Sequence, residues 1–202
     1  MNIQTLPQEG AEDGAPSRSQ RLRAATHPTH EILDKRIMSA DPFGSRERYG
    51  MFLKIQFDFH LAIDDLYDDG NVASVISDIG SRRRLDLIRQ DIVDIGGQAP
   101  SLPSAPDEPI HVPTAFGWLY VAEGSSLGAA FLLKEARKLG LSESFGARHL
   151  AGNEDGRGLH WRRFTAALDA AAFDEDEDRQ VVEGAQQAFD RVLSLVERTF
   201  PQ

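Results

Sequence analysis

One long apolar stretch near the middle of the chain limits the fold more than any other feature. Residues 116–134 read FGWLYVAEGSSLGAAFLLK, and Gly124 and Gly128 lie four positions apart within them. The run predicts a buried central helix, while Glu123, two serines and three glycines make it a poor membrane span. Glycine inside a helix costs about 0.5–1 kcal/mol relative to alanine, so two glycines one turn apart need an explanation.

The remaining segments repeat their apolar residues with the period of an α-helix, and the sequence has no convincing strand pattern. We therefore predict an all-α fold with one domain over residues 17–202, after a flexible tail over residues 1–16. Pro28 is expected to kink or restart the first helix, and Ser45 to cap the second. Residues 173–178, FDEDED, are expected to form an acidic turn. The apolar side expected for the first helix consists of Leu22, Ala25, Thr29, Ile32, Leu33 and Ile37.

The charge and the lack of cysteine exclude several classes of protein. The formal net charge is −10, which disfavours binding to nucleic acid or an anionic membrane and favours a basic protein partner. Without cysteine, the chain has no disulfide, thiolate nucleophile, iron–sulfur ligand or Cys-zinc site. The N-terminal residues lack the apolar segment of a signal peptide, so we expect a cytoplasmic protein.

The six histidines are the natural candidates for binding a cofactor between helices. The Glu-x-x-His spacing of a di-iron site occurs only at Glu108–His111, inside a proline-rich loop, and His-Glu-x-x-His is absent. His27 and His30 flank Pro28, and either could be the single axial ligand of a heme or a partly exposed helix histidine. The remaining three, which we expect to be structural or to lie behind the site, are His60, His149 and His160.

Two segments taken together resemble the bacterial heme oxygenase family: LRAATHPTHEILD, and much later GWLYVAEGSSLGAAFLLK. The resemblance runs from about Ser19 to Phe200 and includes DPFGSRERY, FGARHLAG and AFDRVLSLVERTF. It implies a heme sandwiched between a proximal helix and a kinked distal helix. It also implies oxidative cleavage of that heme at a meso carbon to biliverdin, with O2 and external electrons, releasing iron and carbon monoxide.

The resemblance also assigns roles to residues at the iron. His30 follows Thr26 by four positions, as the family's iron ligand does, so His30 is the expected axial ligand. Gly124 and Gly128 match the glycines that bring the distal helix close to the heme, where a Cβ would collide with the porphyrin or bound oxygen. The competing interpretation is a close helix crossing through G-x-x-x-G. Four positions match those that order distal water in the family: Gln56, Arg84, His149 and Trp161. Arg84 is also a possible helix cap, and Trp161 a possible core residue.

Other matching positions concern the heme propionates and the heme orientation. Arg23 and Tyr120 are expected to contact the propionates, with Arg162 a weaker candidate, and Ser125 offers a distal hydroxyl. Some pseudomonad members rotate the heme with an asparagine and two lysines. This chain has Arg23, Met38 and Glu135 at those places, so we expect the usual α-meso opening.

Two other functions compete with the enzyme: a module that stores or senses heme, and thiamin hydrolysis on the same fold, which needs a cysteine nucleophile. The chain carries no flavin or nucleotide motif, so electrons must come from a separate ferredoxin or ferredoxin reductase. A basic reductase suits the acidic surface best. We expect a monomer that serves iron acquisition or supplies a bilin chromophore.

Overall fold

The computed structural model describes residues 15–102 and 110–201, and over this range it contains helices and turns but no strand, apart from isolated bridges around Ser142. The predicted all-α fold is thereby confirmed for these residues. Of the predicted tail, residues 1–14 lie outside the described part. The helices are α1 (Arg18–Ser39), α2 (Arg46–Ala62), α3 (Gly70–Val75), α4 (Leu85–Asp94), α5 (Val112–Lys138), α6 (Arg157–Ala170) and α7 (Glu175–Thr199), with 3-10 turns η1 (Asp64–Tyr67), η2 (Ile79–Arg82) and η3 (Arg148–Leu150).

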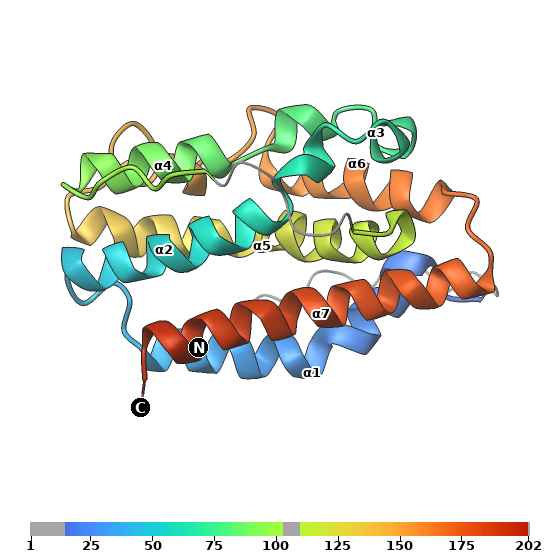
Figure 1. Ribbon diagram of the computed structural model, residues 1–202, viewed down its shortest axis with the longest axis horizontal. Coiled ribbons are helices and arrows are strands. Elements are labelled where there is room, and N and C mark those ends of the chain that lie inside the picture. Colours follow the sequence, from blue (N-terminus) through green and yellow to red (C-terminus); the bar gives the residue numbers. More distant parts are fainter. Residues whose placement is uncertain (1–14, 103–109, 202) are drawn as a thin grey trace.

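Helix α5 is the centre of the fold, as the apolar run predicts. It passes through the middle of the molecule, with α1 and α7 on one side and α4 and α6 on the other (Figure 1). Its main neighbours are α7 and α6, while α1 packs on α7. By length and composition α5 could also span a membrane, but 56% of its most apolar window is buried inside the protein, as expected of a core helix.

A close helix crossing joins α5 to α7 through Gly117 and Gly184, two glycines that were not among the predicted site residues. A Cβ at Gly117 would lie 2.7 Å from the carbonyl carbon of Gly184. A Cβ at Gly184 would lie 2.9 Å from the carbonyl carbon of Thr114. These neighbours are main-chain atoms that cannot rotate away. The small-residue crossing therefore exists, but it uses Gly117 and Gly184 rather than Gly124 and Gly128.

The helix ends follow local sequence signals. Ser17 and Ser45 cap α1 and α2, and Ser17 forms a reciprocal capping box with Gln20. Pro28 lies inside α1, which continues past it as one helix and bends rather than restarting (Figure 1).

Two details of the sequence analysis were wrong. Ile32 was expected on the buried side of α1, but it is 57% exposed. The acidic segment 173–178 is not a separate turn, because residues 175–178 form the first turn of α7 with Asp174 as its cap. Carboxylates are favourable there, since they face the positive end of the helix dipole.

Candidate functional site

The two histidines of α1 differ in what surrounds them. The ring of His30 meets that of Phe189 on α7 edge-on, with centroids 5.9 Å apart, and its Nδ1 lies 3.2 Å from Asp34 Oδ2. Phe189 is buried in the core, so His30 stands at the edge of the α1–α7 interface. His27 is 67% exposed against 58% for His30, and it pairs only with Glu31 among the described residues, with no aromatic contact of its own there. Packing therefore distinguishes His30 as the better-positioned imidazole.

An orienting carboxylate accompanies His30. Asp34 lies one helical turn after it, and an Nδ1–H that donates to Asp34 leaves Nε2 with the free lone pair that a metal requires. Asp34 was not predicted, although a carboxylate four residues after a histidine on a helix was a visible signal.

One face of α5 forms an incompletely covered stripe. Tyr120, Gly124, Gly128 and Phe131 follow one another at helical spacing, and Leu127 lies beside them. Phe131 is 52% exposed and Leu127 39% exposed, although both are large and apolar. A Cβ at Gly128 would meet no atom within 4 Å. The stripe is therefore apolar, open and lacking side-chain bulk where the glycines lie.

Aromatic and cationic groups close one end of this stripe. The ring of Tyr120 packs 5.2 Å from that of Trp161 on α6, and a Cβ at Gly124 would sit 3.5 Å from the same indole. Burial raises the pKa of Tyr120, and the nearby cation of Arg23 on α1 opposes that rise. The structure thus brings together Tyr120, Gly124 and Trp161, which were predicted separately, whereas Arg23 acts on Tyr120 only through its charge.

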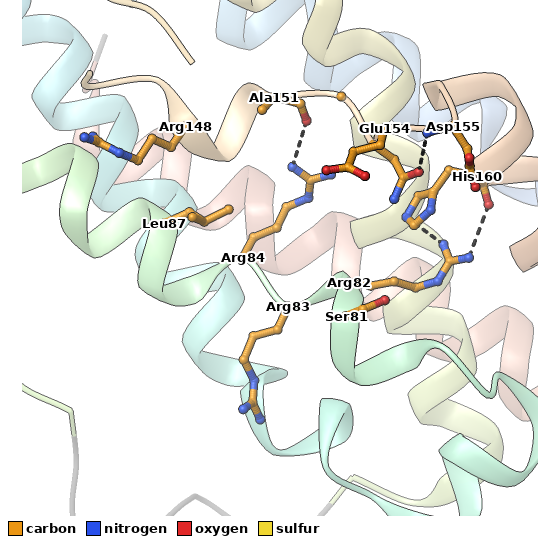
Figure 2. A pocket seen from close by; sticks show the side chains of 12 residues that line it. Ser81, Arg82, Arg83, Arg84, Leu87, Arg148, Ala151, Glu154, Asp155 and His160 are labelled. Atoms are coloured by element: carbon orange, nitrogen blue, oxygen red, sulfur yellow. Dashed lines mark hydrogen bonds between the residues drawn. The ribbon is translucent and has the colours of Figure 1, made fainter. Parts of the chain in front are cut away.

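Behind α5 lies a buried ionic cluster. The Glu123 carboxylate is 3% exposed and accepts a 2.8 Å bond from Arg82, which also donates to both oxygens of Asp78. His160 Nε2 lies 2.9 Å from the same Arg82 nitrogen and 3.4 Å from the Glu123 carboxylate. Figure 2 shows Arg82 and His160 together at a pocket of about 430 Å³.

A second buried polar group surrounds Arg84. Its guanidinium donates to the main-chain carbonyls of His149 at 2.5 Å and Ala151 at 3.3 Å, the latter drawn in Figure 2. It does not cap α4 through its side chain, although it is the residue before that helix. His149 Nδ1 lies 2.7 Å from Asp91, and burial lowers the pKa of His149. Burial likewise lowers the pKa of His60 to about 3, with Arg84 and His149 adding to the shift.

Several polar atoms in this region have no hydrogen-bond partner among the described residues: His60 Nδ1, His149 Nε2 and Tyr67 Oη. The pKa of Tyr67 is raised by burial, and Arg84 is among the charges that act on it. Buried polar atoms of native proteins are generally hydrogen-bonded, and ordered water is the usual partner when protein groups are not.

The other predicted positions are less closely tied to these groups. Gln56 is half-buried on α2, one turn before His60. Ser125 donates to the carbonyl of Ala122 in its own helix. Arg162 is exposed, as Arg23 is, so exposure does not separate the two as propionate contacts. At the positions relevant to heme orientation, Met38 is 46% exposed and Glu135 pairs with Lys138.

The metal-site alternatives gain no support. Glu108 of the Glu-x-x-His spacing lies outside the described residues, and His111 is the residue directly before α5. Within residues 15–102 and 110–201, no group of three or more histidines and carboxylates is arranged to hold a metal ion.

Comparisons with known proteins show which family the chain resembles in sequence and fold. The family model described as Heme oxygenase matches residues 17–198. Heme oxygenase PigA of Pseudomonas aeruginosa is 41% identical over 184 residues, covering 91% of this chain and 93% of that protein. The NO- and CO-bound heme oxygenase from Neisseria meningitidis has a TM-score of 0.86 at 39% identity, covering 92% of this chain and 93% of that one. Heme oxygenase 2 from Chlamydomonas reinhardtii, solved without heme, shares the fold with a TM-score of 0.77 at 16% identity, covering 92% of this chain and 98% of that one. The chain therefore belongs to the heme oxygenase family.

Proposed function

We propose that this enzyme opens heme at a meso carbon, forming biliverdin and releasing iron and carbon monoxide, with O2 and external electrons. Membership of the heme oxygenase family supports this activity. The observation that carries it is the pairing of two features on helices that both pack on α7. One is the exposed, carboxylate-oriented imidazole of His30 on α1, and the other is the apolar stripe of α5 opened by Gly124 and Gly128.

The residues present fit a heme held between α1 and α5. His30 would bind the iron through Nε2, because Asp34 engages Nδ1. A flat apolar ligand would cover Leu127 and Phe131, whose exposure is otherwise unfavourable. At Gly128 the ligand could approach the helix backbone itself, since no Cβ intervenes. Bound heme supplies the iron centre at which oxygen is reduced and directed at the porphyrin.

The polar groups at the stripe have separate tasks. Arg23 and the Tyr120 hydroxyl would bind propionates, which need cationic or hydroxyl partners. Protons would reach the distal side along water bound to Arg84, His149 and Gln56. The unpartnered buried atoms near Arg84 support such a water chain, because water would satisfy them. Trp161 contacts Gly124 and would hold the distal helix on the side of Tyr120.

The finer assignments follow from charge and from the residues at the heme orientation positions. The proposed opening is at the α-meso carbon, since Arg23, Met38 and Glu135 do not reproduce the residues of the rotated-heme members. The proposed electron donor is a basic flavin-dependent ferredoxin reductase, which the net charge of −10 would attract. We place the enzyme in the cytoplasm as a monomer with one catalytic domain over residues 17–202. The product would serve iron acquisition or bilin supply.

A heme-storing module is the alternative function, and turnover separates the two. The purified protein is titrated with heme while the visible spectrum is recorded, and a reductant is then added in air. Enzyme activity predicts a histidine-ligated heme spectrum that gives way to the biliverdin band. A heme spectrum that persists under reductant and air would support storage or sensing instead.

A further inference from the structure

Two arginines, Arg82 and Arg157, contact the glycine segment of α5 through Glu123 and Ser126. Neither arginine is among the residues proposed to face the heme. Glu123 directly precedes Gly124, and its buried carboxylate accepts from Arg82. Arg82 is itself 1% exposed and fixed by Asp78, so it is a rigid anchor on η2. Because the carboxylate belongs to α5 and the guanidinium to η2, the pair fixes the start of the glycine segment.

The second anchor acts on the helix backbone. Arg157, at the start of α6, donates from Nη1 to the main-chain carbonyl of Ser126 at 2.8 Å and from Nη2 to that of Leu150 at 2.5 Å. A carbonyl oxygen has two lone pairs, so Ser126 can accept from Arg157 as well as from its own helix. Burial lowers the pKa of Arg157, and Arg84 adds to this shift, so the contact holds a partly desolvated cation against α5.

The helix between and beyond these anchors is intrinsically weak. Gly124 and Gly128 lower its helical propensity, and the hydroxyls of Ser125 and Ser126 bond back to carbonyls three residues earlier. Such back-bonding slightly destabilises and bends helices. On the heme-facing side, Gly128 has no neighbour within 4 Å of a Cβ position. The groups that fix the position of this segment are therefore Arg82, Arg157 and, at Gly124 only, the Trp161 indole.

We propose that Arg157 and Arg82 are positioning residues that hold the distal helix from behind and so set the distance between the Gly124–Gly128 backbone and the heme. The proposal rests on the proposed function only in taking heme as the ligand that lies against the Gly124–Gly128 segment. Neither arginine needs to touch heme, because each acts through α5, one on the Ser126 carbonyl and the other on the Glu123 carboxylate. Removing a hydrogen bond to a charged group should shift a local equilibrium by about tenfold.

The test compares three variants with the wild type. Arg157→Met removes both main-chain hydrogen bonds while keeping much of the side-chain volume, and Arg157→Lys restores a single cationic donor. Arg163→Met, on the same helix, removes only an exposed pair with Asp155 and is the matched control. Hydrogen exchange is measured on the heme-free chain, and heme affinity, CO stretching frequency and biliverdin formation on the loaded one.

We expect Arg157→Met to exchange the amides of residues 124–131 about tenfold faster, since the anchoring hydrogen bonds are lost. Its heme affinity should stay near that of the wild type, because His30 is untouched, whereas the CO frequency should shift and turnover should fall. Arg157→Lys should partly restore the amide exchange rate, the CO frequency and the turnover, and Arg163→Met should change none of the three. Wild-type exchange and CO frequency in Arg157→Met would overturn the proposal.

Glu123→Gln provides an independent readout for Arg82, because it keeps the shape but removes the charge that Arg82 faces. We expect this variant to exchange the amide hydrogens of α5 faster, and only those, while its thermal unfolding remains cooperative. Unchanged exchange would remove Arg82 from the proposal. Failure of the wild type to make biliverdin would count against the proposed function, whereas the exchange experiment on the heme-free chain would still decide whether the anchors act.

Discussion

Alanine at Gly184 and alanine at Gly128 should have opposite effects on stability, because the two glycines are there for different reasons. At Gly184 a Cβ would lie 2.9 Å from the carbonyl carbon of Thr114 and 3.0 Å from its Cα, with the carbonyl oxygen closer still. At Gly128 a Cβ would meet nothing within 4 Å. The substitution is the same in both cases, and both positions lie inside helices, so propensity alone predicts an equal gain.

The magnitude at Gly184 follows from how far the helices must separate. Ordinary contact begins at 3.4 Å, so the carbonyl carbon of Thr114 must retreat from α7 by about 0.5 Å and its closer carbonyl oxygen by more than about 1 Å. A gap of about 0.5–1 Å forfeits a quarter to a half of the dispersion energy of each facing atom pair. Phe116 and Val181, both fully buried, are among the side chains affected. With overpacking costing about 1–3 kcal/mol in general, we expect Gly184→Ala to lose about 3 kcal/mol.

Gly128→Ala should instead stabilise the heme-free protein by about 0.5–1 kcal/mol, the propensity difference between the two residues. For a chain of this size, 1 kcal/mol corresponds to about 2–4 °C in Tm, so Gly128→Ala should melt about 1–4 °C higher and Gly184→Ala about 6–12 °C lower. Biliverdin formation by Gly128→Ala should nevertheless fall, because its methyl group occupies the side on which heme binds. Gly128→Leu should still fold but block turnover.

The assay is thermal unfolding of the heme-free proteins followed by circular dichroism, with heme titration and turnover on the same samples. Gly117→Ala is a second test of the crossing and should resemble Gly184→Ala. Equal loss of stability at Gly128 and Gly184 would refute the distinction, and so would a fully active Gly128→Leu.

Three further outcomes test the remaining assignments. His30→Ala should abolish the histidine-ligated heme spectrum while His27→Ala retains it, and loss of the spectrum in His27→Ala alone would contradict the ligand assignment. Burial lowers the pKa of His60 from 6.5 to about 3, so below pH about 6.5 the unfolded chain binds a proton that the folded chain does not. As the pH is lowered from 6.5 to about 3, the free energy of unfolding in urea should therefore fall by up to about 1.4 kcal/mol per pH unit. The fall should be less steep in His60→Gln. Turnover driven by a basic reductase should slow as salt increases, because screening shortens the range of attraction; a rate that is flat or rises with salt would reject this donor.

Much of the fold could be predicted because its signals are local. The cap at Ser45 and the buried run of α5 depend on residues a few positions apart, and the structure agrees with both. The helix crossing was not predictable, since Gly117 and Gly184 are 67 positions apart and isolated glycines occur throughout the chain. Ile32 was misplaced for a related reason: helical periodicity defines a side of α1 but not how much of that side α7 covers.

The site divides in the same way. His30, Tyr120 and the glycines were identified by resemblance, and the sequence alone could not separate His30 from His27. The groups behind α5 were missed because they come together only in the fold. One signal was available, because a carboxylate inside an apolar run, Glu123, predicts a buried cationic partner. The sequence offered many arginines for that role and no means of choosing Arg82 or Arg157 among them.

The glycines at the front of α5 and the arginines behind it meet one physical requirement. A helix that lets a ligand approach its backbone must lack side chains there, and a helix without side chains loses the packing that would otherwise fix its position. Anchors on the opposite side restore that position without filling the front. Glu123 and Ser126 flank Gly124, so the anchors lie within one turn of the opening that they support. Weakening the anchors should therefore alter the distal side of the heme before it alters heme binding, which is the order of effects that the Arg157 variants measure.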